Sequence, residues 1–169
     1  MKHCLIVIDM QEGVFCLKRA VFHKDILLQK VNSAIRSARS RGIGVVFFRH
    51  ENSTFLKKGT DGHQFVDGLD VSSGDIVLEK QRPDIFADTG LDGLMKQAGV
   101  TSIIIAGVIS NGCIRDGCLS ALSRGYHVTL VEDAHSTFYA NAADIVLQIN
   151  KQMAQAGARV IPADELDLI

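Results

Sequence analysis

The sequence has no long hydrophobic run. None of its apolar stretches approaches the roughly 20 residues that a membrane-spanning helix needs. Near the N-terminus, the five apolar residues 4–8 lead directly into Asp9. That run is too short for the core of a signal peptide, and no small-residue cleavage site follows it. We therefore expect a cytoplasmic protein that does not bind a membrane.

An excess of charge of one sign is also missing. The 169 residues include 18 lysines and arginines against 19 aspartates and glutamates, which gives a formal net charge of −1. This balance gives no reason to expect binding to nucleic acid or to an anionic membrane surface. A small-molecule partner fits the composition better than either.

Motifs that would indicate a metal or a cofactor are absent as well. The four cysteines, Cys4, Cys16, Cys113 and Cys118, form no Cys-x-x-Cys pair, so neither a zinc site nor a thioredoxin motif is indicated. A disulfide framework is not expected in a cytosolic chain of this size. No Gly-x-Gly-x-x-Gly follows the first apolar run, and no P-loop lysine pattern occurs. We expect no metal and no cofactor.

What the sequence does contain is an alternation of short apolar runs with helical patterns. Such runs are typical of strands buried on both faces of a parallel sheet, and apolar residues three or four apart predict helices. The expected strands cover residues 4–8, 45–48, 76–78, 102–106, 127–131 and 159–161, and the expected helices cover 26–41, 89–98, 113–124 and 141–156. The alternation predicts one α/β domain over residues 1–169, with three layers α/β/α around a six-stranded, mostly parallel sheet.

Two details of this pattern concern helix starts and one long connection. Asp25 is a plausible N-cap for the first helix, and Thr89 with Asp92 resembles a capping box. Residues 49–75 form an irregular stretch with four glycines. A loop of that length in a compact domain is usually functional, such as a lid, or disordered.

Chemically active residues follow several of the expected strands. In an open parallel sheet, ligands bind at the carboxyl ends of the strands. The residues at those ends are Asp9, Arg49 with His50, Lys80, the segment 107–113, and Asp133. An acid, a lysine and a cysteine therefore fall on one rim of the sheet.

Cys113 is the most informative of these residues. It follows a glycine-bracketed turn and is expected in the first turn of the next helix, where unpaired backbone N–H groups stabilise anions. That setting lowers the pKa of a thiol and supplies donors for an oxyanion. The alternative is a buried core cysteine, which is the better description of Cys118 in the same helix.

Asp9 and Lys80 each have a structural alternative. Asp9 could be a metal ligand, a cap of the following turn, or a base that accepts the proton of a thiol. Lys80 could be a solvated surface charge, or in a cleft it could stabilise two neighbouring anions. His50 with His63, and Asp133 with His135, look like metal ligands, but their spacing is not diagnostic.

Together these segments resemble the isochorismatase-like cysteine hydrolases, the superfamily that includes nicotinamidases and carbamoylsarcosine amidases. The matching segments span nearly the whole chain in the family's order: residues 5–11 (LIVIDMQ), 79–86 (EKQRPDIF), 106–113 (AGVISNGC) and 125–134. The resemblance implies a sheet order of 3-2-1-4-5-6 and a catalytic triad of Asp9, Lys80 and Cys113. It also implies a cis peptide between Val108 and Ile109, with an oxyanion hole formed by the N–H groups of Ile109 and Cys113.

The resemblance further implies a substrate class. The presence of Cys113 favours acyl transfer, and hence hydrolysis of a small carboxamide through a thioester, over the vinyl-ether cleavage of true isochorismatases. Nicotinamidases carry an Asp-x-His metal motif after the second strand, whereas residues 49–51 here read Arg-His-Glu, so no metal is expected. We expect four residues at the substrate pocket: Gln11, Phe15, His50 and Phe86.

Some alternatives remain open at this level. A receiver-like or flavodoxin-like binding module is also doubly wound, although Lys80 stands where a receiver would carry its phosphate-accepting acid. Strand three is expected about 10 Å from strand one, at roughly 4.8 Å between strands, so Lys80 must reach across to join Asp9. Family members often assemble as dimers or tetramers, and we expect a homo-oligomer here.

Overall fold

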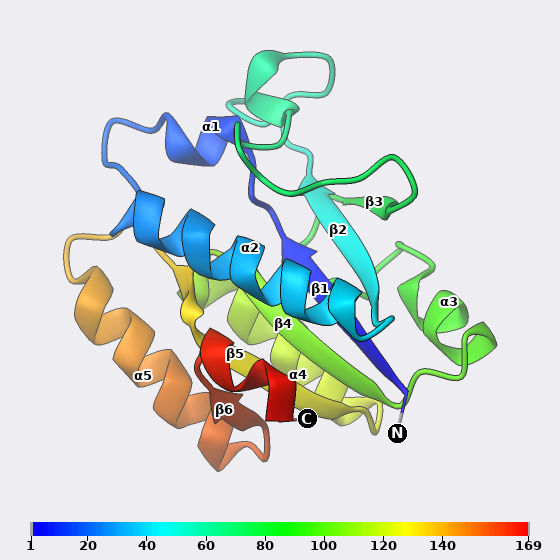
Figure 1. Ribbon diagram of the computed structural model, residues 1–169. Helices are drawn as coiled ribbons and strands as arrows, with labels where there is room; N and C mark the ends of the chain where they lie inside the picture. The colour runs from blue at the N-terminus through cyan, green and yellow to red at the C-terminus, as the bar shows by residue number, and fades with distance from the viewer. Residues whose placement is uncertain (1, 169) are drawn as a thin grey trace.

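Six parallel strands form the centre of the protein. The structure is a computed structural model that describes residues 2–168 (Figure 1). The sheet order is β3-β2-β1-β4-β5-β6, as the resemblance implied, and each neighbouring pair is parallel. The strands are β1 (His3–Ile8), β2 (Gly44–His50), β3 (Ile76–Lys80), β4 (Ser102–Val108), β5 (His127–Ser136) and β6 (Arg159–Ile161).

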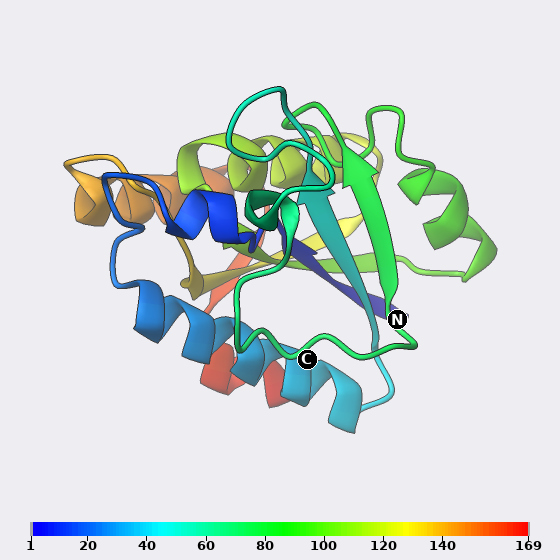
Figure 2. The same cartoon turned by 90° about the horizontal axis from the view of Figure 1, so that it is seen from above.

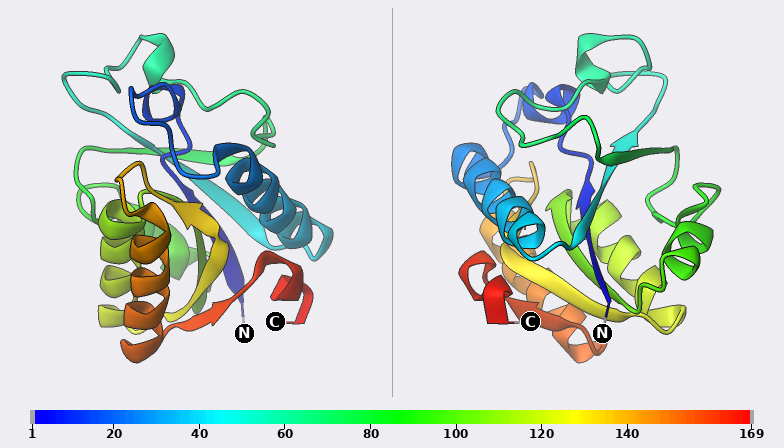
Figure 3. Two further views of the ribbon diagram at one scale, coloured as in Figure 1. Left: turned by 90° about the vertical axis from the view of Figure 1, so that its left-hand side faces the viewer. Right: turned by 45° about the vertical axis from the view of Figure 1, so that its right-hand side comes forward.

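Helices cover both faces of this sheet, which confirms the three-layer α/β/α prediction (Figures 2 and 3). One face is covered by α2 (Lys24–Ser40), the four-residue helix α1 (Glu12–Phe15) and the C-terminal 3₁₀ helix η3 (Ala163–Leu168). The other face is covered by α3 (Leu91–Gln97), α4 (Arg115–Ser123) and α5 (Ala142–Gln155). Strands at the centre of such a sandwich have no solvent-facing side, which explains their continuous apolar runs.

The alternation of side chains along β1 shows this directly. Leu5 and Val7 pack into the core under α2, whereas Ile6 and Ile8 pack into the core under α4 and α5. Successive side chains of a strand point to opposite faces, and all four of these are at most 1% exposed. Each face of β1 therefore contributes to a separate apolar layer, and together the two layers hold the sheet between the helices.

Several predicted element ends were wrong. The N-cap of α2 is His23, in the left-handed conformation with φ 50°, and Asp25 lies inside the first turn. The predicted capping box does not form, because Gly90 is the N-cap of α3 with φ 74°. The Thr89 hydroxyl donates to the Ile85 carbonyl and accepts from the Leu91 N–H. β5 continues to Ser136, so Asp133 lies within that strand.

The connection from β2 to β3 lies over α1 and the end of β1 and is hydrogen-bonded to the residues there (Figure 1). It contains one short 3₁₀ helix, η1 (Asp61–His63). The Val66 N–H donates to the Met10 carbonyl over 2.9 Å. Gly13 of α1 lies so close to the Phe55 carbonyl that a Cβ at this position would overlap it. This loop is therefore fixed against the rim of the sheet where the reactive residues gather.

In the part of the chain that the structure describes, no helix combines the length and apolar character that crossing a membrane requires.

Candidate active site

The switch in strand order places Asp9 and the segment before Cys113 side by side. β1 and β4 are neighbours in the sheet, with Ile8 paired to Gly107. A Cβ on Gly107 would overlap the Ile8 carbonyl, and the residue has φ 123°, so only glycine fits this approach. Asp9 is the residue after Ile8 and has φ 53°. Its N–H donates to the Phe48 carbonyl of β2 over 3.1 Å.

Lys80 reaches this pair from two strands away. It is the last residue of β3 and pairs in register with His50 at the end of β2. Its side chain crosses the end of β2, so that Nζ lies 2.7 Å from Asp9 Oδ2 and 3.1 Å from Cys113 Sγ. Nζ also lies 3.1 Å from His50 Nδ1. The distance between the strands is thus spanned by the length of the lysine side chain.

The resulting ion pair is almost fully enclosed, since the Lys80 side chain is 0% exposed and that of Asp9 is 5% exposed. Burial alone lowers the pKa of Lys80, but Asp9 and Cys113 outweigh it and the pKa is raised overall. A buried pair of this kind depends on both partners, because removing one leaves an uncompensated charge. Lys80 is therefore held as an ammonium between the other two groups.

Cys113 does not have the lowered pKa that its expected helix position suggested. Burial, and then the neighbouring Asp9 carboxylate, raise the pKa of the Cys113 thiol to about 12, against an opposing effect of Lys80. The backbone also differs from the prediction, because Cys113 lies in a widened helical turn, η2 (Ser110–Ile114), and α4 begins only at Arg115. The resting group is therefore a thiol.

An acceptor for the thiol proton is close by. Asp9 Oδ1 is buried and has no hydrogen-bond partner among the described residues. One ligand atom from each of Asp9, His50 and Cys113 lies within 4.8 Å of the others. A carboxylate oxygen that is free of partners and adjacent to a thiol is suited to act as a general base.

The turn before Cys113 contains the cis peptide that the resemblance implied, between Val108 and Ile109. Behind this turn lies a buried network that the sequence did not reveal. The Ser110 hydroxyl lies 2.9 Å from His135 Nδ1, and His135 Nε2 lies 2.8 Å from Asn150 Oδ1. Asn150 Nδ2 donates to the Glu132 carbonyl, so its Oδ1 accepts from His135 Nε2 and leaves Nδ1 to accept from Ser110.

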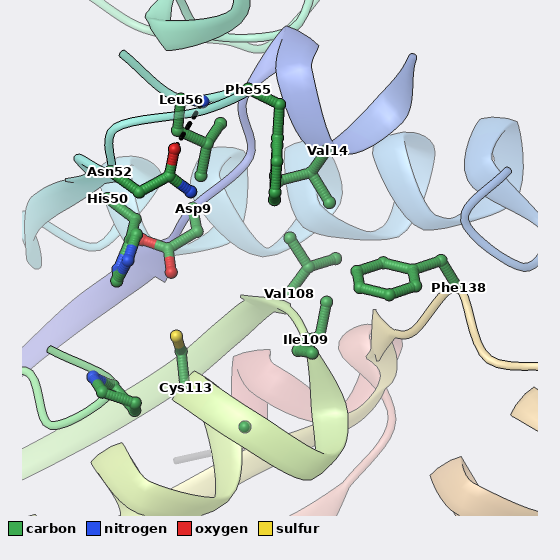
Figure 4. A pocket seen from close by; sticks show the side chains of 12 residues that line it. Asp9, Val14, His50, Asn52, Phe55, Leu56, Val108, Ile109, Cys113 and Phe138 are labelled. Atoms are coloured by element: carbon green, nitrogen blue, oxygen red, sulfur yellow. Dashed lines mark hydrogen bonds between the residues drawn. The ribbon is translucent and has the colours of Figure 1, made fainter. Parts of the chain in front are cut away.

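A pocket of about 240 Å³ opens onto Cys113 and Asp9 (Figure 4). His50, which was expected at the substrate pocket, is among its lining residues, and so are Val108 and Ile109 of the cis peptide. The rest of its wall was not predicted and comes from α1, from the loop between β2 and β3, from η2, and from the connections that follow β3 and β5. These lining residues are Val14, Asn52, Phe55, Leu56, Pro83, Gly112 and Phe138.

Three residues expected at the pocket are not part of its wall. Phe15 is buried in the core under α2. Phe86 packs in the opposite core against Tyr126, with ring centroids 5.8 Å apart. The Gln11 amide is buried and bridges the backbone of His50 and the carbonyl of His63, so it positions the end of β2 and the loop after it.

The same cluster contains side chains that could bind a metal ion. Asp9, His50 and Cys113 offer a carboxylate oxygen, an imidazole nitrogen and a sulfur, which are all metal-binding donors. Each of these residues, however, already contacts the Lys80 ammonium. A metal ion at their centre would have to displace a lysine, so this donor set does not fit a resident metal.

Comparison with known proteins agrees with this arrangement. A family model described as the isochorismatase domain matches residues 3–165. Streptothricin hydrolase of Streptomyces noursei is 29% identical over 168 residues, which cover 98% of this chain and 61% of that protein. Ureidoacrylate amidohydrolase RutB of Methylorubrum extorquens is 28% identical over 161 residues, which cover 73% of this chain and 63% of that protein. The chain thus spans less than two thirds of the length of either relative.

The fold has close counterparts among solved structures. The crystal structure of an isochorismatase from Pseudomonas putida superimposes with a TM-score of 0.88 at 26% sequence identity, and the match covers 96% of this chain and 89% of that one. The family model, the strand order and the cluster at the switch between β1 and β4 lead to the same assignment. The chain belongs to the isochorismatase family.

Proposed function

We propose that the protein is a cysteine-dependent hydrolase that cleaves a small carboxamide through a thioester intermediate. The observation that carries this proposal is the Lys80 ammonium, which contacts both the Asp9 carboxylate and the Cys113 sulfur, two groups that line a pocket. Two relatives named as a hydrolase and an amidohydrolase support the reaction class. A binding module of the receiver or flavodoxin type would not need a thiol beside a free carboxylate oxygen.

The proposed reaction begins with proton transfer. Asp9 Oδ1 accepts the thiol proton as the Cys113 sulfur attacks the carbonyl carbon of the amide. The carbonyl oxygen becomes an oxyanion, for which the N–H groups of Ile109 and Cys113 serve as donors. Lys80 stays paired with the negative charge, first on Asp9 and then on the sulfur.

The second half of the reaction releases the products. Asp9 returns the proton to the amide nitrogen, the C–N bond breaks, and ammonia or an amine leaves. The acyl group remains on Cys113 as a thioester. Asp9 then takes a proton from a water molecule that attacks the thioester carbon. The C–S bond breaks, Asp9 returns this proton to the Cys113 sulfur, and the carboxylic acid departs.

This proposal is tested by ammonia release from a panel of small carboxamides. We expect Cys113→Ala, Asp9→Asn and Lys80→Met each to reduce kcat/KM by at least about 10³-fold, because residues that act as one unit fail together. Circular dichroism checks that each variant is folded. Mass spectrometry of the native protein, quenched during turnover, is expected to show the acyl group on Cys113.

Two results would count against the proposal. Ammonia release that persists in Cys113→Ala would mean that another nucleophile does the chemistry. Release of pyruvate from a vinyl-ether substrate, unaffected by Cys113→Ala, would favour the isochorismatase reaction. A cytoplasmic location and a homo-oligomeric state, dimer or tetramer, remain proposals that fractionation and light scattering would test.

A further inference from the structure

We infer that the site selects amides whose acyl group is compact and uncharged, with Phe138 as the residue that sets this preference. The inference rests on the proposed amide hydrolysis and adds the substrate class to it. It comes from the chemistry of the pocket wall, the size of the pocket and the positions of its two aromatic side chains.

The wall of the pocket beyond the reacting groups is almost entirely apolar. Its apolar members are Val14, Phe55, Leu56, Pro83, Val108, Ile109 and Phe138. Among the described lining residues there is no lysine or arginine, and Asp9 is the only carboxylate. An acyl group bound here would therefore contact carbon on most of its surface.

The two remaining polar side chains cannot balance a charge. The side-chain oxygen of Asn52, Oδ1, already accepts from the backbone N–H groups of Thr54 and Leu56, at 3.0 and 2.9 Å. Burial, and then the Lys80 ammonium, lower the pKa of His50, which keeps its ring neutral at neutral pH. Both side chains can hydrogen-bond to a neutral polar group, but neither carries a charge that could neutralise a charged acyl group.

A charged acyl group would be penalised whichever sign it carried. A carboxylate would lose its hydration, would find no basic residue in the wall and would lie near the Asp9 carboxylate. Lys80 would not compensate, because it already contacts Asp9 and Cys113. An ammonium would also lose its hydration, and it would lie near the ammonium of Lys80. We expect either charge to reduce binding and kcat/KM by at least about 100-fold relative to a neutral group of the same shape.

The pocket is also small. Its volume of about 240 Å³ lies below the roughly 300–1,000 Å³ that is usual for ligand pockets. Phe55, from the loop after β2, and Phe138, from the connection after β5, border this space from different sides (Figure 4). Phe138 is only half-buried and lies at the margin of the core under α2.

The test uses amides that differ in charge but not in shape. Pentanamide is compared with 4-aminobutanamide, and 4-methylpentanamide with succinamate. Ammonia release is measured with the native protein, and binding is measured separately by saturation-transfer NMR with Cys113→Ala. We expect both neutral amides to bind and to be the better substrates of each pair.

Variants at one position test the role of Phe138. Phe138→Lys places a cation at the wall and is expected to raise kcat/KM for succinamate, relative to 4-methylpentanamide, by roughly tenfold. Phe138→Leu is the matched control, which keeps the preference for the neutral member. If Phe138→Lys left the ratio unchanged, Phe138 would not set the preference.

Failure of this inference can be separated from failure of the proposed reaction. Neutral amides that bind to Cys113→Ala without being hydrolysed by the native protein would support the pocket chemistry and refute the reaction. A charged amide that binds or reacts as well as its neutral isostere would overturn the inference, and so would the absence of binding by both neutral amides.

Discussion

We expect His135 to make the free energy of unfolding fall at acidic pH, and we expect its replacement to remove that part of the pH dependence. His135 is 3% exposed, and its burial lowers its pKa to about 4 from an ordinary value of 6.5. Between these two values the unfolded chain binds a proton that the folded chain does not. The free energy of unfolding therefore falls as the pH drops through this window, and it is highest above pH 6.5.

The size of the effect follows from the two pKa values. At about pH 5, an unfolded pKa of 6.5 and a folded pKa near 4 correspond to a loss of roughly 2 kcal/mol relative to pH 7.5. The full loss, reached below pH 4, is about 3 kcal/mol. We expect the difference in unfolding free energy between the native protein and His135→Gln to shrink by about 2 kcal/mol between pH 7.5 and pH 5.

Urea denaturation at several pH values measures this difference, because contributions from all other titrating groups cancel between the two proteins. His127→Gln is the matched control, since His127 is exposed at the start of β5. Ser110→Ala removes one partner of His135 but leaves the imidazole buried, so it should keep the native pH slope. A His135→Gln protein with the same pH slope as the native protein would refute the reasoning.

Three further predictions concern the site and its surroundings. In a Cys16→Ser background, alkylation of Cys113 by iodoacetamide should rise about tenfold per pH unit up to pH 9, because its thiol has a pKa of about 12; a plateau below pH 9 would contradict this. Gly13→Ala should displace the Phe55 carbonyl and with it the pocket wall, lowering kcat/KM by about 10- to 100-fold in steady-state assays. Gly107→Ala forces a side chain onto the backbone of β1 and should destabilise the fold by about 3–5 kcal/mol, measured by urea denaturation; an unchanged midpoint would refute the steric argument.

The sheet could be predicted from the sequence because its signals are local. Strands buried on both faces are continuously apolar, and two of their ends are marked by Asp9 after β1 and by Gly107 near the end of β4. The order of the strands depends on contacts between distant segments, and it came from the resemblance of four segments rather than from periodicity. Lys80 is an example of a contact that no local signal predicts. Its contact with Asp9 depends on the register between β2 and β3 and on a side chain that crosses β2.

The pocket was harder to predict for the same reason. In α1, successive residues point about 100° apart, so Val14 lines the pocket at the edge of the core, whereas Phe15 contributes to the core and not to the pocket wall. Phe55 and Phe138 belong to connections without periodicity, where nothing in the sequence tells which way a side chain points. The expected position of Cys113 at a helix terminus predicted a lowered pKa, whereas burial and then Asp9 raise the pKa of this thiol.

A resting thiol is compatible with catalysis in this site because the total charge of the triad stays constant. Before attack, the proposed state is a carboxylate at Asp9, an ammonium at Lys80 and a neutral thiol at Cys113. When the proton moves to Asp9 Oδ1, the sulfur takes the negative charge and Lys80 still contacts it at 3.1 Å. Changing the net charge of a buried site is costly, whereas moving a proton between two partners of the same ammonium leaves that net charge unchanged. In the proposed reaction, the raised pKa of the thiol and the fixed position of Lys80 therefore belong to one arrangement, in which the Cys113 nucleophile forms only as Asp9 accepts its proton.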